Sequence, residues 1–230
     1  MDKRGMYMSQ IKAFVFDAYG TLFDVFSVTK KCEELYPNKG DQISQTWRKK
    51  QLEYSYLRQM MGDYQPFAQV TRDALRYAVE EAGAELTPDN EEVLFEAYQQ
   101  LSVYEEVPQV LKDLKAEGIT LAIFSNGSHD MLDPLVKQSP LAEYLDYVIS
   151  ADDIKQFKPT PASYTHALNF LELSRENILF MSSNGWDISG AKNFGFHTAW
   201  INRNNLPVEQ LNLIPDSIYE DLSHLTNWVK

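Results

Sequence analysis

Four polar segments, three of them directly after a short apolar run, contain the residues that could do chemistry in this chain. The first is Asp17, which follows the apolar residues Val15 and Phe16 and precedes a turn at Gly20. A carboxylate at the end of a buried strand is costly unless it is used, either as a nucleophile or as a cap for the turn that follows. Considered alone, this segment leaves both uses of Asp17 open.

The second and third segments supply hydrogen-bond donors and a cation. Ser125 and Asn126 follow the apolar run Ala122–Phe124 and offer hydroxyl, amide and backbone N–H groups. Lys158 precedes Pro159, which restricts the backbone of Lys158 to an extended form and can direct its ammonium into a cleft. Taken alone, the polar pair could only satisfy a turn, and the lysine could be a surface residue before a helix.

The fourth segment, Ser182-Ser183-Asn184-Gly185-Trp186-Asp187, follows the apolar run Ile178–Met181 and opens a predicted helix. The N–H groups and the dipole at a helix N-terminus favour anions. Asp187 is therefore either a second functional carboxylate or only a helix-start residue.

Composition and charge limit the partners of the protein. Its 230 residues are 44% hydrophobic and 23% charged, enough for one substantial core with a smaller second domain. A formal net charge of -12 argues against a nucleic-acid or membrane partner, because both need a basic face. An anionic substrate would need a local cationic pocket.

Cysteine use and hydropathy indicate a cytoplasmic protein. Cys32 is the single cysteine, so an internal disulfide is excluded, and no Cys/His cluster has the spacing of zinc ligands. No apolar run approaches the roughly 18 residues of a membrane-spanning helix. We also expect no secretion signal, because the first apolar stretch is cut short by Asp17.

The pattern of apolar runs predicts an α/β fold, with a Rossmann-like parallel sheet and helices on both of its faces. The predicted strands are Ile11–Phe16, Leu121–Phe124, Tyr147–Ile149, Ile178–Met181 and Thr198–Ile201, and the predicted helices between the later strands are Met131–Lys137, Pro161–Leu171 and Ile188–Phe194. Residues 25–101 instead show helical periodicity, in Ile43–Met61, Phe67–Ala82 and Asn90–Tyr104.

These patterns predict two units. Residues 1–23 and 104–230 form a catalytic core, and residues 24–103 form an inserted helical cap of about four helices. Ligands of open α/β sheets bind outside the carboxyl ends of the strands, so we expect the cap to sit over that edge.

In this order, the four segments resemble the haloacid dehalogenase superfamily, which has a nucleophilic Asp after the first strand, Ser or Thr after the second, Lys before a later helix and an acidic loop after the fourth. The resemblance covers essentially the whole chain and is most specific for the 2-haloacid dehalogenases. The segments that carry it are Asp17–Asp24, Trp47–Tyr54, Ser125–Ser128, Lys158-Pro159 and Ser182–Asp187.

The resemblance implies that Asp17 attacks the halogen-bearing carbon and forms an ester, which water then cleaves. It also implies that Lys158 keeps Asp17 ionised and that Arg48 contacts the departing halide. The implied catalytic residues are Asp17, Thr21, Lys158, Ser182, Asn184 and Asp187; the implied substrate- and halide-binding residues are Tyr19, Arg48, Leu52, Phe67, Ser125, Asn126, Tyr164 and Trp186.

Two positions separate the chain from the phosphatases of this superfamily. Those enzymes have a second Asp two residues after the nucleophile, where this chain has Tyr19. They also hold magnesium with an acidic pair four residues apart, where this chain has Ser183 before Asp187. With one charged oxygen ligand missing, we expect no bound metal and no other cofactor.

The resemblance therefore implies hydrolysis of a small (S)-2-haloacid to an (R)-2-hydroxyacid. Related enzymes are often dimers, so we expect a homodimer. Two alternatives remain: a phosphatase or other hydrolase on the same scaffold, or a binding protein that keeps the fold without catalysis.

Overall fold

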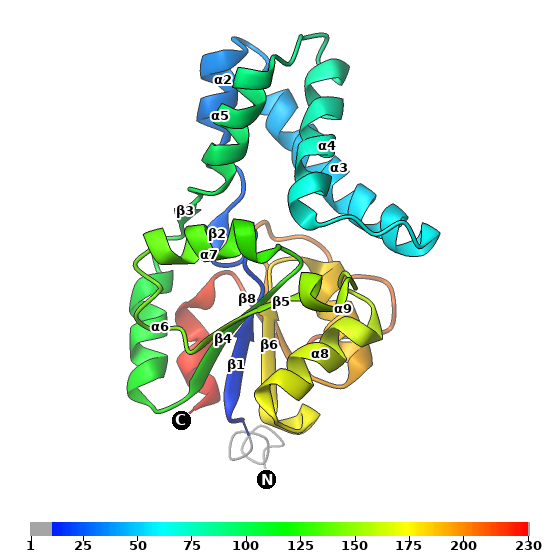
Figure 1. The fold of residues 1–230 in the computed structure, drawn as a ribbon. Coiled ribbons are helices and arrows are strands. Elements are labelled where there is room, and N and C mark those ends of the chain that lie inside the picture. Colours follow the sequence, from blue (N-terminus) through cyan, green and yellow to red (C-terminus); the bar gives the residue numbers. More distant parts are fainter. Residues whose placement is uncertain (1–10, 230) are drawn as a thin grey trace.

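The computed structural model describes residues 11–229, and a six-stranded parallel sheet forms its centre (Figure 1). The strands lie in the order β5-β4-β1-β6-β7-β8, and every neighbouring pair is parallel. Their bounds are β1 Ala13–Phe16, β4 Thr120–Ser125, β5 Tyr147–Ser150, β6 Ile178–Ser182, β7 His197–Ile201 and β8 Ser217–Tyr219. The α/β fold class is confirmed. Residues 1–10, which we assigned to the core, lie outside the described residues.

Successive side chains of β1 point to opposite faces of the sheet, and different helices cover the two faces. Phe14 and Phe16 belong to one apolar cluster, with residues of α6 (Val107–Ala116), α7 (His129–Gln138) and the 3-10 helix η3 (Leu222–Trp228). Ala13 and Val15 belong to a second cluster, with residues of α8 (Pro161–Leu171) and α9 (Gly185–Phe194). The central strand is thus buried on both sides, as a parallel strand requires.

Helices α2 (Thr29–Leu35), α3 (Gly40–Met61), α4 (Phe67–Glu81) and α5 (Pro88–Tyr98) lie together above the sheet in Figure 1. Side chains four residues apart on α3, namely Ile43, Trp47, Gln51 and Ser55, form its buried stripe. We call α2–α5 the helical cap. The predicted domain boundaries at residues 23/24 and 103/104 remain a prediction.

Three short strands of the structure were not predicted from the sequence. Strand β2 (Phe23–Asp24) pairs antiparallel with β3 (Ser102–Val103) between the sheet and the helical cap. The prediction of a helix through Tyr104 was therefore wrong, because α5 ends at Tyr98 and the next residues enter this pair. Strand β8 was also missed; its three residues are half-buried or exposed, so they lack the apolar run that marks a central strand.

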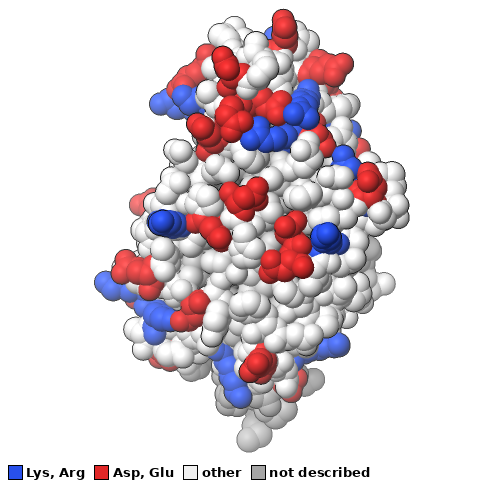
Figure 2. Space-filling view, viewed as in Figure 1, with Lys and Arg blue, Asp and Glu red and all other residues white. Residues whose placement is uncertain are grey.

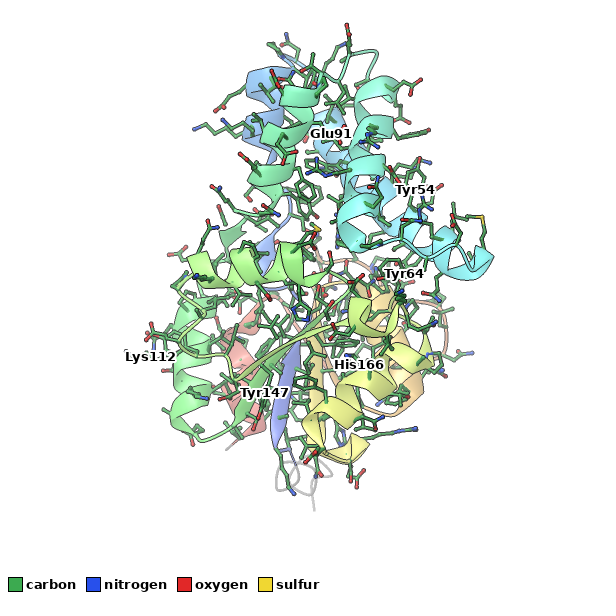
Figure 3. The ribbon with its side chains drawn as sticks, in the orientation of Figure 1. Tyr54, Tyr64, Glu91, Lys112, Tyr147 and His166 are labelled. Carbon is green, nitrogen blue, oxygen red and sulfur yellow. The ribbon has the colours of Figure 1, made fainter. Side chains whose placement is uncertain are left out.

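Side chains of the cap contact the core beside β5. Gln59 of α3 accepts a hydrogen bond from the N–H of Phe157 (2.8 Å) and donates to Gln156 (3.0 Å). Tyr64, labelled in Figure 3, donates its hydroxyl hydrogen to Asp152 in the 3-10 helix η1 (Ala151–Ile154). These contacts fix the lower end of α3 close to Lys158.

Both acidic and basic side chains lie on the face of the molecule shown in Figure 2. In the cap, Arg76 pairs with Glu91 at 2.7 Å. Within residues 11–229, every helix is too short or too polar to cross a lipid bilayer.

A glycine on α9 sets the distance between α8 and α9. A Cβ at Gly190 would lie 2.5 Å from both the Pro159 Cβ and the Tyr164 hydroxyl oxygen. Ala normally stabilises a helix relative to Gly by about 1 kcal/mol, but overpacking costs about 1–3 kcal/mol. We expect Gly190→Ala to lower the free energy of unfolding in urea titrations.

The matched control is Gly185→Ala on the same helix. There the nearest atom is the Glu209 carboxylate at 2.9 Å, the far end of an exposed side chain that can move away. We expect Gly185→Ala to change the free energy of unfolding by no more than about 0.5 kcal/mol. Equal stability of the two variants would contradict the close packing at Gly190.

Candidate active site

The carboxyl ends of three adjacent strands bring polar residues to one edge of the sheet. Asp17 follows β1, Ser125 ends β4 and Ser182 ends β6, and β1 lies between the other two. The N–H of Asp17 still donates to the carbonyl of Met181 (2.8 Å), so the sheet fixes the backbone at this residue. Because the strands are parallel, side chains far apart in sequence meet here.

Both carboxylate oxygens of Asp17 accept hydrogen bonds. Its Oδ1 accepts from the Lys158 ammonium at 2.9 Å. Its Oδ2 has three donors: Asn184 Nδ2 at 3.0 Å, Thr21 Oγ1 at 3.2 Å and Ser182 Oγ at 3.3 Å. These contacts fix the orientation of a carboxylate whose residue is only 5% exposed.

Lys158 lies between two carboxylates. Its ammonium donates to Asp17 (2.9 Å), to Asp187 Oδ2 (2.7 Å) and to the carbonyl of Phe124 (3.1 Å), which uses all three of its hydrogens. Burial by itself would lower the pKa of Lys158, but attraction to Asp17 and Asp187 outweighs burial and raises that pKa above its ordinary value. Lys158 therefore stays charged.

Asp187 is fully buried on α9. Its Oδ1 accepts from the Tyr164 hydroxyl at 2.7 Å, and its Oδ2 accepts from Lys158. Burial raises the pKa of Asp187 to about 6, although Lys158 acts against this shift; the negative charge of Asp17 adds to it. A raised pKa makes Asp187 a candidate general base.

The turn after Asp17 packs against the loop after β6. Gly20 has φ +86°, a conformation that favours glycine, and a Cβ there would lie 3.1 Å from Ser183 Oγ. Thr21 Oγ1 accepts a hydrogen bond from the N–H of Ser183 at 2.8 Å. Arg203, which sequence reasoning missed, donates to the carbonyl of Thr21 at 2.9 Å and holds the turn from the other side.

Arg48 reaches this edge from the helical cap. Its Nη2 donates to the carbonyl of Tyr19 (3.3 Å) and to Asn184 Oδ1 (3.4 Å). Because Asn184 also donates to Asp17, one amide joins the guanidinium of the cap to the carboxylate of the sheet. A cation thus lies beside a nucleophile candidate, although the chain as a whole is acidic.

The two polar residues at the end of β4, Ser125 in the strand and Asn126 after it, accept hydrogen bonds from nearby backbone N–H groups. Asn126 Oδ1 accepts from the N–H of Lys158 at 2.7 Å and so fixes the segment that carries the ammonium. Ser125 Oγ accepts from the N–H of Gly127 at 3.1 Å. Both residues remain predicted substrate contacts.

The apolar and aromatic residues predicted to contact the substrate are Tyr19, Leu52, Phe67 and Trp186. The ring of Tyr19 lies 5.6 Å from the rings of both Phe67 and Tyr98. Leu52 lies one helical turn after Arg48 on α3 and is half-buried. Trp186 lies between Asn184 and Asp187, and its ring is 5.3 Å from that of Tyr56.

Sequence reasoning missed three polar residues of the cap that lie close to these groups: Gln51, Tyr56 and Tyr98. Gln51 contacts Arg48, and Tyr98 contacts Gln51. The available signal was the position of Gln51 three residues after Arg48 and four after Trp47, on the buried stripe of α3.

Among residues 11–229, no group of three His, Cys, Asp or Glu side chains is arranged to hold a metal ion. The two carboxylates at this edge, Asp17 and Asp187, both bind the Lys158 ammonium. This donor set does not fit a magnesium site, which needs several oxygen ligands around the ion.

A family model described as haloacid dehalogenase-like hydrolase matches residues 11–195. The chain belongs to the haloacid dehalogenase-like hydrolases. A curated member of this family from Pseudomonas putida, named (S)-2-haloacid dehalogenase, is 43% identical over 222 residues, which cover 96% of this chain and 98% of the relative.

Solved structures of haloacid dehalogenase-like hydrolases have the same fold. A crystal structure of an L-2-haloacid dehalogenase superposes with a TM-score of 0.93 at 41% identity and covers 96% of this chain and 99% of the other. The L-2-haloacid dehalogenase of Xanthobacter autotrophicus with chloropropionic acid covalently bound gives a TM-score of 0.88 at 39% identity, covering 95% and 98%.

The shared ammonium predicts a pH-dependent loss of stability in Lys158→Met. Removing one partner of a buried charge cluster costs about 3–5 kcal/mol. Without Lys158 the already raised pKa of Asp187 rises further. A carboxyl with a raised pKa in the folded protein holds its proton more tightly there than in the unfolded chain, so folding becomes less favourable as the pH rises. The loss of stability in Lys158→Met should therefore be larger at pH 7.5 than at pH 5. Urea titrations at both pH values measure this.

Lys155→Met provides the control, since Lys155 is exposed and lies three residues away. We expect it to change the unfolding free energy by less than about 0.5 kcal/mol at either pH. A pH-independent loss in Lys158→Met would argue against two buried carboxylates sharing this ammonium.

Proposed function

We propose that this protein is an (S)-2-haloacid dehalogenase, a hydrolase that converts short (S)-2-haloalkanoic acids to (R)-2-hydroxyacids. The observation that carries the proposal is the buried Asp17 carboxylate, bound by Lys158 and joined through Asn184 to Arg48. The names of the relatives given above support the same reaction.

In the first step, a carboxylate oxygen of Asp17 attacks the carbon that bears the halogen, from the side opposite the halogen. The new carbon–oxygen bond forms an ester, and the carbon–halogen electron pair leaves with the halide. Arg48 stabilises the charge that develops on the halide, aided by Asn126 and by apolar contacts from Leu52, Phe67 and Trp186. The covalently bound chloropropionic acid in the Xanthobacter relative supports an ester of this kind.

In the second step, water adds to the side-chain carbonyl carbon of Asp17. Asp187 takes a proton from the water, with Ser182 and Asn184 orienting it and Tyr164 holding Asp187. The bond between this carbon and the original Asp17 oxygen, which now carries the substrate carbon, breaks. That oxygen receives a proton, and the hydroxyacid departs with it. When one oxygen of Asp17 forms the ester, the other becomes the carbonyl oxygen, on which negative charge develops as water adds. Either oxygen has hydrogen-bond donors that can stabilise this charge: Lys158 for Oδ1, and Asn184, Thr21 and Ser182 for Oδ2.

The substrate carboxylate needs its own donors. Ser125 and the N–H groups after β4 lie beside Asp17 at the same edge of the sheet and can hold this group, together with Thr21. The ring of Tyr19 covers the substrate. Burial raises the pKa of the Tyr19 hydroxyl well above its ordinary value, so the side chain stays neutral and does not repel the anionic substrate. We further propose that the protein acts in the cytoplasm, as a homodimer and without metal or other cofactor.

A phosphatase is the second candidate on this scaffold, but two features disfavour it. Tyr19 stands where a phosphatase of the superfamily has the acid that protonates the leaving alcohol. A phosphate dianion would also be repelled by ionised Asp17 in the absence of a divalent cation. A haloacid carries one charge and needs no acid for its leaving group.

A halide-release assay tests the reaction. The protein should release chloride or bromide from (S)-2-chloro- and (S)-2-bromopropionate in excess chelator, with the (R) enantiomers and phosphate esters as comparison substrates. One inversion should give (R)-lactate, because the second step breaks no bond at the chiral carbon. Ion chromatography and chiral analysis measure both products.

The outcome that refutes the proposal is phosphate-ester hydrolysis that needs magnesium, without halide release. Retained configuration in the lactate would instead refute the two-step sequence. A fully active preparation after exhaustive chelation is the expected result.

Labelled water distinguishes the ester from direct attack by water, which also inverts the chiral carbon. With enzyme in excess over substrate in heavy-oxygen water, the ester route places water oxygen in Asp17, and the first hydroxyacid released carries an original carboxylate oxygen. Mass analysis of peptides should find the label in the fragment with Asp17.

The fragment with Asp187 serves as the internal control, because the ester route leaves it unlabelled. Label in the first-turnover product, with Asp17 unlabelled, would rule out the covalent route and leave the dehalogenase assignment intact.

A further inference from the structure

A buried polar network lies behind Arg48 in the helical cap. Gln51 Oε1 accepts hydrogen bonds from Arg48 Nη1 at 2.8 Å and from the Tyr98 hydroxyl at 2.9 Å. Gln51 Nε2 donates to Thr71 Oγ1 at 2.8 Å. Helices α3, α4 and α5 each contribute a residue to this network, and the side chains of Gln51, Thr71 and Tyr98 are almost fully buried.

The chemistry of these partners permits one orientation of the Gln51 amide. Arginine has only donors, so the Gln51 atom 2.8 Å from Arg48 Nη1 must be the amide oxygen. The Tyr98 hydroxyl, 2.9 Å from the same oxygen, then donates to it. A reversed amide would place an N–H group of Gln51 against the guanidinium of Arg48, which cannot accept. Gln51 is therefore an acceptor for Arg48, and its own position is fixed by α4 and α5.

The partner of Arg48 in this network is neutral. A buried carboxylate at position 51 would form a charge-assisted pair with the guanidinium and cancel much of its charge. An amide oxygen fixes Nη1 and leaves the positive charge of Arg48 available to an anion. The other contacts of Arg48, at Tyr19 and Asn184, are also to neutral oxygens.

We propose that Gln51 is a positioning residue for Arg48: held by Tyr98 and Thr71, it fixes the guanidinium toward the leaving halide without neutralising it. This inference rests on the proposed function, in which the halide departs toward Arg48. It makes the cap helices α4 and α5 part of the catalytic machinery through contacts that do not involve the substrate.

The proposal predicts an effect on one chemical step. Charge develops on the halide only while the ester forms, and the halide has left before water attacks Asp17. Loss of the Arg48 position or charge should therefore slow ester formation and leave ester hydrolysis unchanged. A residue that only stabilises the cap would not separate the two steps in this way.

Two substitutions test the two parts of the proposal. Gln51→Met removes the acceptor and keeps the volume, so Arg48 loses its anchor. Gln51→Glu keeps the shape and an acceptor for Arg48, but it adds a charge that pairs with the guanidinium. Gln45→Glu is the matched control, because it makes the same change at an exposed position of the same helix.

Single-turnover rapid-quench experiments on (S)-2-bromopropionate would follow bromide release for the first step and lactate release for the second. We expect both Gln51 variants to slow bromide release roughly 10- to 100-fold, the factor that corresponds to a hydrogen bond to a charged group. Ester decay should stay within about twofold of wild type. Inhibition by added bromide should weaken in the same variants, and Tyr98→Phe should show a smaller effect on bromide release.

Three results would overturn the proposal. Bromide release by Gln51→Glu at the rate of Gln45→Glu refutes it, even if Gln51→Met fails to fold. Equal slowing of both steps reduces Gln51 to a structural role. A wild-type protein that releases no halide refutes the proposed function and this inference with it, whereas an active wild type with unaffected variants refutes the inference alone.

Discussion

The buried Lys158 ammonium is the interaction on which the rest of the site depends. Two carboxylates as close as Asp17 and Asp187, both nearly inaccessible to water, would repel each other strongly without a cation between them. Lys158 binds both and the carbonyl at the end of β4, so its position is set by the sheet as well as by charge. The pKa of Asp187, raised to about 6, reflects the remaining cost of burial.

A second constraint is the position of the helical cap over the sheet edge. Asn184 joins Asp17 to Arg48, and Gln59 and Tyr64 connect the far end of α3 to the segment that carries Lys158. In the proposed mechanism, the nucleophile therefore comes from the end of a strand, and the cation for the leaving group comes from a helix of the cap. Precision on both sides matters, because attack opposite the halide requires the two to be aligned.

The same arrangement separates this chain from metal-dependent members of its superfamily. In a metal site, a divalent cation would offset the negative charges. Here, Lys158 binds Asp17 directly, and Asn184 links Asp17 to Arg48. Such a site suits a substrate with one negative charge whose leaving group is itself an anion. The neutral anchor that we propose at Gln51 keeps that limited positive charge available.

Local signals were enough to predict the α/β class, the main strands and helices, and the polar segments after β1, β4 and β6. These signals are apolar periodicity and polar residues that follow an apolar run. The sequence also identified Arg48 through a family resemblance. Three contacts became visible only in the folded chain: Asn184 bridges Asp17 and Arg48, Tyr164 holds Asp187, and Gln51 anchors Arg48. These contacts join residues on different elements, or depend on how α3 is rotated and how the cap sits over the sheet. The short strands β2, β3 and β8 escaped prediction for a related reason: they form by pairing with distant segments, and two or three residues carry too little periodicity to reveal it.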